Sequence, residues 1–496
     1  MNAASTVPLH TAAQAREFDR IAIAQEGVSG GELMARAGAA LFGALVSHWP
    51  GARRVLVLCG AGNNAGDGYV TARLLEEGGI GVQVLWLADP DGLRGDARAA
   101  ADACRRAGVD MAPYGDSLPQ DADVLVDALL GTGLTRPLEG RWRQVVEAMN
   151  RHRAPVLAAD LPSGLAADTG CVLGVAVEAD VTVTFIARKR GLYTAAGRHC
   201  SGTVLFDDLG VPPRVLESLP PAAELLLRPP LGPLGRPRRR DAHKGDCGHV
   251  LVVGGNAGLA GAARMAAEAA ARAGAGLVSV ATRPAHVAAM SAARPELMCH
   301  GVDDARGLAP LLARADVVAV GPGLGRDRWA QALLGRVLDA GLPLVVDADA
   351  LNLLAREPER RHDWILTPHP GEAGRLLGRS TAGVQADRFA AADELARRYG
   401  GVAVLKGAGT LVAVDGLPVR VCGAGNPGMA SGGMGDVLTG LIAALLAQGL
   451  GGFDAASAGV CLHAAAADDA AAADGERGLL ATDVLGGIRR RLNATD

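Results

Sequence analysis

The chain has 496 residues and a formal net charge of −4, with 49% hydrophobic and 21% charged residues. This length predicts two domains, and the composition is typical of a globular protein and argues against a general nucleic-acid surface. No apolar run reaches the ~18 residues of a membrane helix, no signal peptide is expected, and the eight cysteines form no CxxC pair, so we expect a cytoplasmic protein with reduced thiols, no zinc and no membrane contact.

The first half of the chain alternates between helical and strand-like segments. Apolar residues recur at helical spacing through residues 1–50. Apolar runs typical of strands follow at residues 53–60, 81–88, 124–131, 154–164, 181–187 and 202–210, with helices predicted at 69–77, 97–108 and 142–150. Such alternation predicts right-handed crossovers and a mostly parallel sheet.

A stretch rich in Pro and Arg, residues 216–240, is predicted to link two domains that cover residues 1–215 and 241–496. The alternation then restarts. Its predicted segments are residues 249–255, 260–273, 277–282, 315–325, 329–340, 343–352, 363–372 and 402–414. The second domain is therefore also predicted to be α/β, with a longer sheet.

A glycine loop, defined here as residues 423–433, runs directly into an apolar helical segment. Gly432, Gly433 and Gly435 permit tight turns and leave backbone N–H groups bare, and a helix N-terminus behind them favours an anion. Asp436 falls in the first turn of that helix, where it would act as a base or orienting group beside a phosphate, or would only cap the helix. The motif predicts phosphoryl transfer to a hydroxyl.

In the first half, polar residues end three of the predicted strands. Gly60, Gly62 and Gly66 follow one strand in a GxGxxxG pattern, which is a weak match to a dinucleotide loop. Asp127 and Asp160 end two others, where each could be only a strand-end cap. Because the carboxyl ends of parallel strands meet at one edge of a sheet, their convergence predicts a ligand site.

Only three lysines occur in a chain with 49 basic residues: Lys189, Lys244 and Lys406. A lysine kept in an arginine-rich background indicates a requirement for a compact ammonium group, although chance explains any single one equally well. Lys406 ends a predicted strand beside a glycine turn, where it would meet a phosphate or only solvent.

The segments NNAGDG, VDALLGTG, RPLEG, DLPSG and ARKRGL together resemble the N-terminal domain of the NAD(P)H-hydrate epimerase family, across most of residues 10–215. The resemblance implies a Rossmann-like, three-layer α/β domain. It further implies a potassium ion held by Asn64, Asp127 and Ser163, whose oxygens suit a hard cation. The family usually has a second glycine where this chain has Ala65, which would tighten the loop slightly.

The same resemblance implies a set of residues that contact the hydrated dinucleotide. Asp160 is the implied substrate carboxylate and the candidate for acid–base catalysis. The full implied set is Asn63, Asn64, Ala65, Gly66, Asp67, Gly131, Thr132, Gly133, Leu134, Thr135, Arg136, Pro137 and Asp160.

The second half, over roughly residues 228–493, resembles the ADP/ATP-dependent NAD(P)H-hydrate dehydratases through the motifs VGPGLG, DADALN, TPHPGE, LKGAGT and GNPGMASGGMGDVLTG. The resemblance implies a ribokinase-like α/β domain. Its implied nucleotide contacts are Lys406, Gly407, Ala408, Gly409, Thr410 and Gly435. Its implied contacts with the hydrated nicotinamide are Ala262, Gly323, His369 and Asp436.

Two residue assignments in the second half stay open from the sequence. His369 lies between prolines and would contact the substrate, or would only be hydrogen-bonded to the backbone. Asp347 and Asp349 would orient Mg²⁺ through waters, or would only cap the following helix.

Together the two resemblances imply metabolite repair. The first domain would interconvert the R and S forms of hydrated NADH or NADPH, and the second would restore the S form to NAD(P)H at the expense of ADP. The expected partners are these hydrates, ADP, K⁺, Mg²⁺ and a second copy of the chain. The alternatives are a vitamin or sugar kinase of the ribokinase-like class, and a nucleotide-binding module without catalysis.

Overall fold

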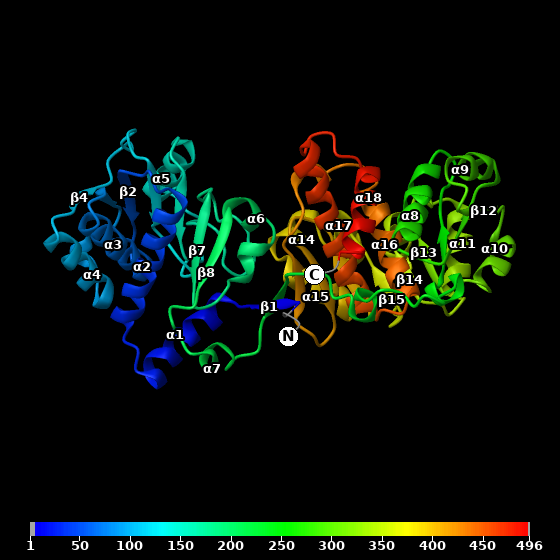
Figure 1. Ribbon diagram of the computed structural model, residues 1–496, viewed down its shortest axis with the longest axis horizontal. Helices are drawn as coiled ribbons and strands as arrows, with labels where there is room; N and C mark the ends of the chain where they lie inside the picture. The colour runs from blue at the N-terminus through cyan, green and yellow to red at the C-terminus, as the bar shows by residue number, and fades with distance from the viewer. Residues whose placement is uncertain (1–4, 495–496) are drawn as a thin grey trace. The chain divides into compact units, whose positions relative to one another are not determined.

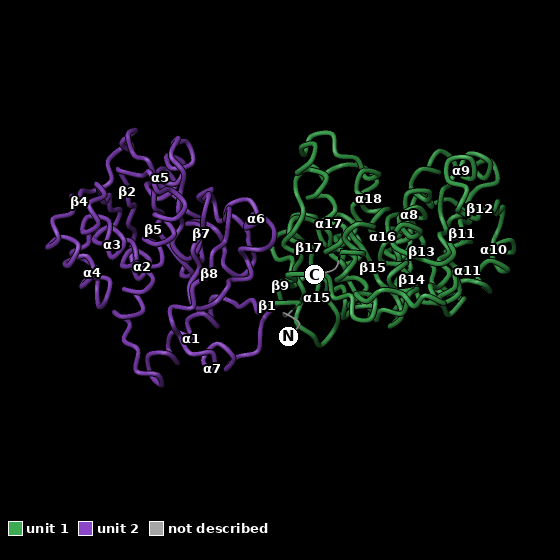
Figure 2. The backbone as a smooth tube through the Cα atoms, in the orientation of Figure 1, with its two compact units in different colours: residues 1–7, 224–496 green, residues 8–223 purple. Residues whose placement is uncertain are grey.

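The computed structural model describes residues 5–494. The chain divides into two compact units, which Figure 2 colours separately. Unit 2 spans Pro8–Ala223, and unit 1 combines Met1–Val7 with Glu224–Asp496. The predicted linker, residues 216–240, contains a strand of unit 1 and a short 3-10 helix (η3, Gly232–Gly235), and Leu231 and Leu234 pack against the core of that unit.

Unit 2 is built on a parallel sheet of seven strands within the described residues. Its strands are β2 (Arg54–Cys59), β3 (Gly81–Trp86), β4 (Asp110–Pro113), β5 (Val124–Ala128), β6 (Val156–Ala159), β7 (Val181–Phe185) and β8 (Thr203–Asp207). Their spatial order is β4-β3-β2-β5-β6-β7-β8, which is the Rossmann order with one added strand. The chain reverses its direction of winding between β2 and β5, so a ligand site is expected there.

Helices cover both faces of this sheet (Figure 1). The longer ones are α1 (Ala12–Glu26), α2 (Gly30–His48), α3 (Asn63–Glu77), α4 (Gly95–Arg106) and α5 (Gly140–Arg151), and two single turns are α6 (Gly197–Cys200) and α7 (Pro213–Leu216). Alternate residues of a strand face opposite sides. Val55 and Val57 accordingly pack with α1 to α4, whereas Leu56 and Leu58 pack with α5. This confirms the predicted three-layer α/β unit.

Helix α3 begins at Asn63, six residues earlier than the predicted start at residue 69. Gly62, with φ 84°, makes the turn from β2, so the polar motif NNAGDG is already helical. Two of its glycines serve close packing instead of a loop. A Cβ on Gly66 would lie 2.4 Å from the sulfur of Met34, and one on Gly68 would lie 2.5 Å from the Cβ of Ala128.

Unit 1 contains a mixed sheet that has eleven strands among residues 5–494, in the order β1-β9-β18-β17-β16-β15-β14-β13-β10-β11-β12. The parallel part comprises β10 (His249–Val253), β11 (Leu277–Thr282), β12 (Met298–Gly301), β13 (Val317–Val320), β14 (Leu344–Val346), β15 (Trp364–Leu366) and β16 (Val402–Leu405). The remaining strands are β17 (Thr410–Val414), β18 (Val419–Cys422), β9 (Ala223–Leu226) and β1 (Thr6–Leu9). The first strand of the chain thus belongs to the second sheet.

The helices of unit 1 are α8 (Ala260–Arg272), α9 (Val287–Ala293), α10 (Ala305–Leu312), α11 (Arg328–Leu338), α12 (Ala348–Leu354), α13 (Pro370–Leu377), α14 (Thr381–Ala386), α15 (Arg388–Tyr399), α16 (Met434–Ala447), α17 (Gly452–Asp474) and α18 (Ala481–Leu492). Helices α8, α16, α17 and α18 form one core with the sheet. Small residues bring α8 and α16 together, because a Cβ on Gly440 would lie 1.8 Å from the carbonyl oxygen of Ala266. Unit 1 confirms the predicted α/β class.

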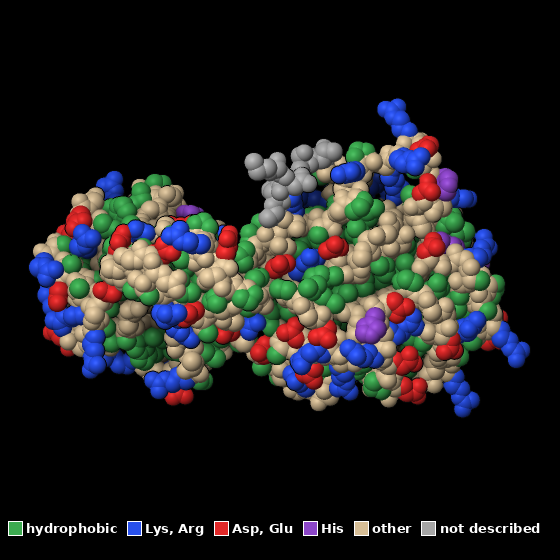
Figure 3. Space-filling model, turned by 90° about the horizontal axis from the view of Figure 1, so that it is seen from below, with side chains coloured by type: hydrophobic (Ala, Val, Ile, Leu, Met, Phe, Trp, Pro, Cys, Tyr) green, Lys and Arg blue, Asp and Glu red, His purple; other side chains and the backbone are tan. Residues whose placement is uncertain are grey.

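The surface seen in Figure 3 mixes acidic and basic side chains with apolar ones. Along residues 5–494 no helix combines the length and apolar character that a membrane crossing needs.

Candidate active sites

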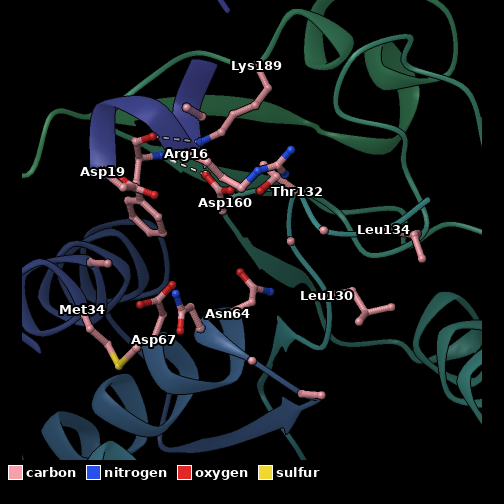
Figure 4. Close-up of a pocket in the computed structure, with 18 of the residues that line it drawn as sticks. Arg16, Asp19, Met34, Asn64, Asp67, Leu130, Thr132, Leu134, Asp160 and Lys189 are labelled. Atoms are coloured by element: carbon pink, nitrogen blue, oxygen red, sulfur yellow. Dashed lines mark hydrogen bonds and ion pairs between the residues drawn. The ribbon is translucent and has the colours of Figure 1, made fainter. Parts of the chain in front are cut away.

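The first site is a cavity of about 930 Å³ in unit 2, at the carboxyl ends of β2, β5 and β6 (Figure 4). It lies where the strand order reverses. The predicted residues that line it are Asn63, Asn64, Asp67, Gly131, Thr132, Gly133, Leu134, Thr135, Arg136, Pro137 and Asp160. Ala65 and Gly66, also predicted, are buried inside α3 and do not line it.

Asp160 enters this cavity from the end of β6 with a φ of 63°, a region that favours glycine. Its Oδ1 accepts hydrogen bonds from Lys189 Nζ, from the Phe185 N–H at 3.2 Å and from the Thr184 hydroxyl at 3.3 Å. Strained residues that their surroundings hold this firmly cluster at functional positions. The result is a negative charge in the cavity wall with its counter-ion behind it.

Lys189 is fixed as firmly as Asp160. The residue is 2% exposed. Its ammonium group donates to the Phe185 carbonyl at 2.8 Å and to the Thr184 hydroxyl at 3.2 Å. Two of the three lysines, Lys189 and Lys406, therefore belong to candidate sites, whereas Lys244 is an exposed residue of a 3-10 turn (η4, Lys244–Cys247).

The sequence analysis missed four charged residues of this cavity: Arg16 and Asp19 of α1, Asp96 of α4, and Glu139 just before α5. Burial raises the pKa of Asp19 to about 6, with the Lys189 ammonium opposing and Asp160 adding to the shift. Burial also raises the pKa of Asp67 well above its usual range, and Asp160 and Asp19 add to that shift. Five carboxyl groups line the cavity, and only that of Asp160 has an ion-pair partner among residues 5–494; the others are Asp19, Asp67, Asp96 and Glu139.

The residues predicted to hold K⁺ lie at or just behind the cavity wall. Asp127 is fully buried and accepts hydrogen bonds from the Ser163 hydroxyl at 2.6 Å, the Ser163 N–H at 2.7 Å and the Leu129 N–H at 3.2 Å. Burial raises its pKa to about 6 despite these bonds. The Asn64 amide nitrogen is buried without a partner in the described chain. A buried carboxylate with oxygen donors around it and no cationic side chain fits a hard monovalent ion.

The second site is built around a lysine–aspartate pair in unit 1. Lys406 ends β16 and donates to Asp347 Oδ1 at 2.7 Å, while the Thr439 hydroxyl of α16 donates to Asp347 Oδ2 at 2.8 Å. Burial lowers the pKa of Lys406, but Asp347 and Glu372 outweigh burial and the net shift is upward. The ammonium group therefore stays charged at the end of the strand.

The glycine loop runs into the N-terminus of α16, which lies beside this pair. Gly433, with φ 92°, precedes the helix, and no side chain caps its first N–H groups. A Cβ on Gly435 would lie 3.2 Å from Lys406 Nζ. Uncapped N–H groups beside a fixed ammonium form a site for phosphate.

Two carboxyl groups face the Lys406 ammonium. Burial raises the pKa of Asp436 to about 7, with Asp347 adding to the shift and Lys406 opposing it. Burial likewise raises the pKa of Glu372 to about 7, with Lys406 opposing. Groups that titrate near neutral pH are suited to proton transfer. Asp436 was predicted from its place in α16, whereas Glu372 was missed because it reads as the capping residue of α13.

His369 lies next to Glu372 and makes the backbone bonds that the sequence left open. The ring nitrogen Nδ1 accepts a hydrogen bond from the Gly371 N–H at 3.0 Å. The backbone N–H of His369 donates to Glu372 Oε2 at 2.8 Å. Burial and then Lys406 lower its pKa, so the ring is neutral at neutral pH.

The other predicted substrate residues of unit 1, Ala262 and Gly323, lie against each other. Gly323 has φ 58°, and a Cβ there would lie 3.2 Å from the Cβ of Ala262 and 2.5 Å from the carbonyl oxygen of Leu259. Gly323 is therefore a position where only glycine fits.

The predicted nucleotide residues 406–410 form the turn between β16 and β17, and a buried arginine lies beneath it. Arg388 is 1% exposed, and its guanidinium donates to the carbonyls of Leu405 at 3.2 Å, Lys406 at 3.3 Å and Gly409 at 3.4 Å. Gly407 has φ 138°, and a Cβ there would lie 2.9 Å from the guanidinium. The sequence analysis missed Arg388, which lies in α15 with no motif of its own.

Neither carboxylate considered for Mg²⁺ is open to it. Asp347 is bonded at both oxygens, and Asp349 Oδ2 accepts from the Gly325 N–H at 2.9 Å. No cluster of three or more His, Cys, Asp or Glu side chains suited to a metal occurs in the part of the chain that is described. Because Mg²⁺ needs only one or two carboxylates when phosphates and waters complete its shell, Asp436 and Glu372 fit it better.

Two family models match the chain, one in each half. The description "YjeF-related protein N-terminus" matches residues 30–191, and "NAD(P)H-hydrate dehydratase" matches residues 250–490. The bifunctional NAD(P)H-hydrate repair enzyme Nnr of Coxiella burnetii is 51% identical over 480 residues, covering 97% of this chain and 98% of the relative. The enzyme of the same name from Escherichia coli is 48% identical, covering 93% and 89%.

One solved structure resembles part of this chain. An ADP/ATP-dependent NAD(P)H-hydrate dehydratase from Bacillus subtilis, co-crystallised with ATP and Mg²⁺, is 29% identical to this chain with a TM-score of 0.46. The likeness covers 51% of this chain and 92% of that one.

Proposed function

This chain belongs to the family of bifunctional NAD(P)H-hydrate repair enzymes, and from that premise we propose which site performs each step and which residues act there. The cavity of unit 2 binds the hydrated dinucleotide and interconverts its R and S forms. The site around Lys406 in unit 1 dehydrates the S form with ADP. The observation that carries the second assignment is the Lys406 ammonium fixed by Asp347 against the uncapped start of α16.

Dehydration requires the ring hydroxyl, a poor leaving group, to become a good one. A phosphoryl group moves from ADP to that hydroxyl and leaves AMP, with Asp436 accepting the hydroxyl proton. Lys406, the turn at residues 406–410 and the N–H groups at Gly435 stabilise the charge on the phosphoryl oxygens. Phosphate then departs, a proton is lost from the neighbouring ring carbon, and the reduced nicotinamide is restored.

His369, Ala262 and Gly323 contact the hydrated nicotinamide in this proposal. The His369 ring is held for this role, because its Nδ1 is engaged with the backbone and its Nε2 lies 3.5 Å from Glu372 Oε1. Gly323 and Ala262 provide a surface without large side chains, against which a flat ring can lie.

The ions are assigned by the chemistry of the donors. Asn64, Asp127 and Ser163 hold K⁺, which neutralises the buried Asp127 carboxylate and stabilises the wall of the cavity. Glu372 would hold Mg²⁺, with waters and phosphates completing its shell, and the ion would supply positive charge there. Replacing K⁺ by tetramethylammonium is expected to slow epimerisation and leave dehydration unchanged. A cytoplasmic location and a homo-oligomeric state stay predictions.

The test of the proposed function is to supply the pure chain with a mixture of both hydrate isomers and ADP. Absorbance of the reduced nicotinamide should recover beyond the share of one isomer, which requires both activities. The Asp160→Asn variant should stop at that share and dehydrate the S form at the normal rate. Loss of both activities in Asp160→Asn would contradict the division of labour.

A second arm of the experiment separates repair from a kinase. Vitamin and sugar alcohols offered with ADP or ATP should give no steady nucleotide consumption. Steady consumption with one of them, and none with the hydrate, would favour the kinase alternative.

A further inference from the structure

Asp67 is the one carboxyl group of the unit 2 cavity that lies on α3, close to the residue that begins this helix. Figure 4 shows Asp67 beside Asn64, while Asp160, Lys189 and Asp19 lie together in another part of the cavity wall, with open space between the two groups. Among residues 5–494 no donor or cation is bonded to the Asp67 carboxyl group. It therefore faces the cavity as an unpaired carboxyl group.

The surroundings of Asp67 raise its pKa and so favour its protonated form. Burial is the largest cause of its raised pKa, Asp160 and Asp19 add to the shift, and Lys189 opposes it. Arg16 and Asp96 also line the cavity. Asp160, in contrast, is bonded directly to the Lys189 ammonium. The cavity therefore presents on α3 a carboxyl group that has a raised pKa and no cationic partner, and at the end of β6 a carboxyl group bonded to the Lys189 ammonium.

Epimerisation of the hydrate needs such a pair. The hydroxyl group must leave one face of the ring carbon and return on the other face. Its departure requires a proton, and the water that returns must lose one. Two groups on opposite faces, one protonated and one ionised, satisfy both needs.

We propose that Asp67 is the second catalytic residue of the epimerase, giving a proton to the hydroxyl that departs from one ring face while Asp160 takes a proton from the water that adds to the other. The proposal rests on the epimerase function assigned to this cavity. The C–O bond breaks as the ring nitrogen lone pair forms a C=N bond, and the oxygen leaves as water with the Asp67 proton.

The return step restores the balance. Water adds to the planar carbon on the Asp160 side, the C=N electron pair returns to nitrogen, and the surplus proton passes to Asp160. Solvent water then carries a proton from Asp160 back to Asp67. Alternatively, the reverse reaction uses the two groups with their roles exchanged. The Asp160 carboxylate also stabilises the cationic ring between the two steps.

This role differs from a mere contact with the hydrated dinucleotide, which is what the resemblance implies for Asp67. An ionised Asp67 beside a phosphate would be repelled, and a contact residue would change the KM of the hydrate more than kcat. A proton donor does the opposite, because its substitution removes an interaction that matters only in the transition state.

The test uses the full chain and one pure isomer without ADP, with the other isomer measured by chromatography. Asp67→Asn is expected to lower kcat for epimerisation at least ~100-fold, the usual contribution of general acid catalysis, with the KM of the hydrate changed less than about threefold. Dehydration of the S form by the same protein should be normal, which shows that unit 1 is folded, and the nearly unchanged KM for epimerisation shows that the cavity of unit 2 is intact. A kcat within threefold of the unaltered chain, or a loss confined to KM, would overturn the assignment.

Two further measurements bear on the chemistry. The rate of epimerisation by the unaltered chain should decline as the pH rises and Asp67 ionises. Asp67→Glu should show the same kind of decline, and the residual rate of Asp67→Asn should not. In ¹⁸O-labelled water the product isomer should acquire the label, since the C–O bond breaks. Retention of the original oxygen would overturn the proposed step. Absence of epimerisation by the unaltered chain would instead overturn the function of the cavity, and this assignment with it.

Discussion

The two units each contain a buried lysine–aspartate pair, but they expose opposite members of it. In unit 2 the side chain of Asp160 is 15% exposed and that of Lys189 is 3% exposed. In unit 1 the order is reversed, with Lys406 at 19% and Asp347 at 2%. The same ion pair therefore presents a carboxylate to one ligand site and an ammonium group to the other.

The exposed member of each ion pair can reach a ligand, whereas the hidden member can only hold the exposed one in place. In unit 2 Lys189 is the hidden partner and holds the carboxylate that, in our proposal, handles protons of the hydrate. In unit 1 Asp347 is the hidden partner, with both oxygens occupied, and holds the ammonium group that we propose meets phosphate. Unit 1 consequently needs a separate base, and Asp436 is the carboxyl group available for it.

The largest expected effect comes from removing that base. Asp436→Asn should slow dehydration by ~10²–10⁴-fold, because the substrate hydroxyl loses its proton acceptor. Epimerisation measured on the same protein should be unchanged. Dehydration at the normal rate would show that the N-terminus of α16 acts without a base, and the comparison between the two pairs would fail.

The next largest effect is expected from Lys406→Met. It should reduce the rate of dehydration by ~100-fold, a typical loss for one electrostatic contact with a transition state. The substitution also leaves Asp347 buried without its cation, which destabilises unit 1. Lys244→Met is the matched control, because that lysine is exposed and outside both sites. Equal losses in the two variants, measured with the hydrate and ADP, would remove the special role of the hidden aspartate.

The pH dependence should differ in sign between the units. Burial raises the pKa of Asp436 to about 7, so its ionised form is present above that pH and is lost as the pH falls. Dehydration should then decline about tenfold per pH unit below 7, since a base acts only when ionised. Epimerisation should decline with rising pH instead, as Asp67 ionises. Parallel pH profiles for the two reactions on one protein would contradict the assignments.

The sequence was informative wherever a site residue follows a strand or starts a helix. Asp127, Asp160 and Lys406 end strands, and Asp436 starts α16, so strand topology alone brings them to sheet edges. It was uninformative for residues whose role depends on a distant element. Thr439 bonds Asp347 across 92 positions, and β1 joins a sheet whose other strands begin 217 or more residues later, between Ala223 and Cys422.

The positions of glycines in the sequence were the poorest guide to their role in the structure. Gly66 was read as part of a weak dinucleotide-loop pattern, yet Gly66 and Gly68 are helical and allow α3 to approach Met34 and Ala128. A sequence shows that a side chain is missing, but only packing shows whether a ligand or a neighbouring chain segment occupies the space.

The smallest expected effect tests a second contrast between the sites. It concerns how two predicted ligand-contact segments are held, residues 406–410 in unit 1 and residues 131–137 in unit 2. In unit 1 the Arg388 guanidinium bonds the carbonyls of Leu405, Lys406 and Gly409 from beneath. In unit 2 no described hydrogen bond joins a buried side chain to the backbone of residues 131–137. Because the C=O and N–H of a trans peptide point in opposite directions, carbonyls drawn toward Arg388 turn the N–H groups of Gly407 and Thr410 away from it, toward the nucleotide.

Arg388→Lys should therefore raise the KM for ADP by about tenfold, since an ammonium group cannot span three carbonyls and one lost charged hydrogen bond is worth about 1.5–3 kcal/mol at most. The KM for the hydrate and the rate of epimerisation should stay unchanged. Gly407→Ala is the complementary change, because its Cβ would lie 2.9 Å from the same guanidinium. If the KM values for ADP and for the hydrate rose together, Arg388 would only support the fold of unit 1, and it would have no specific effect on the turn at residues 406–410.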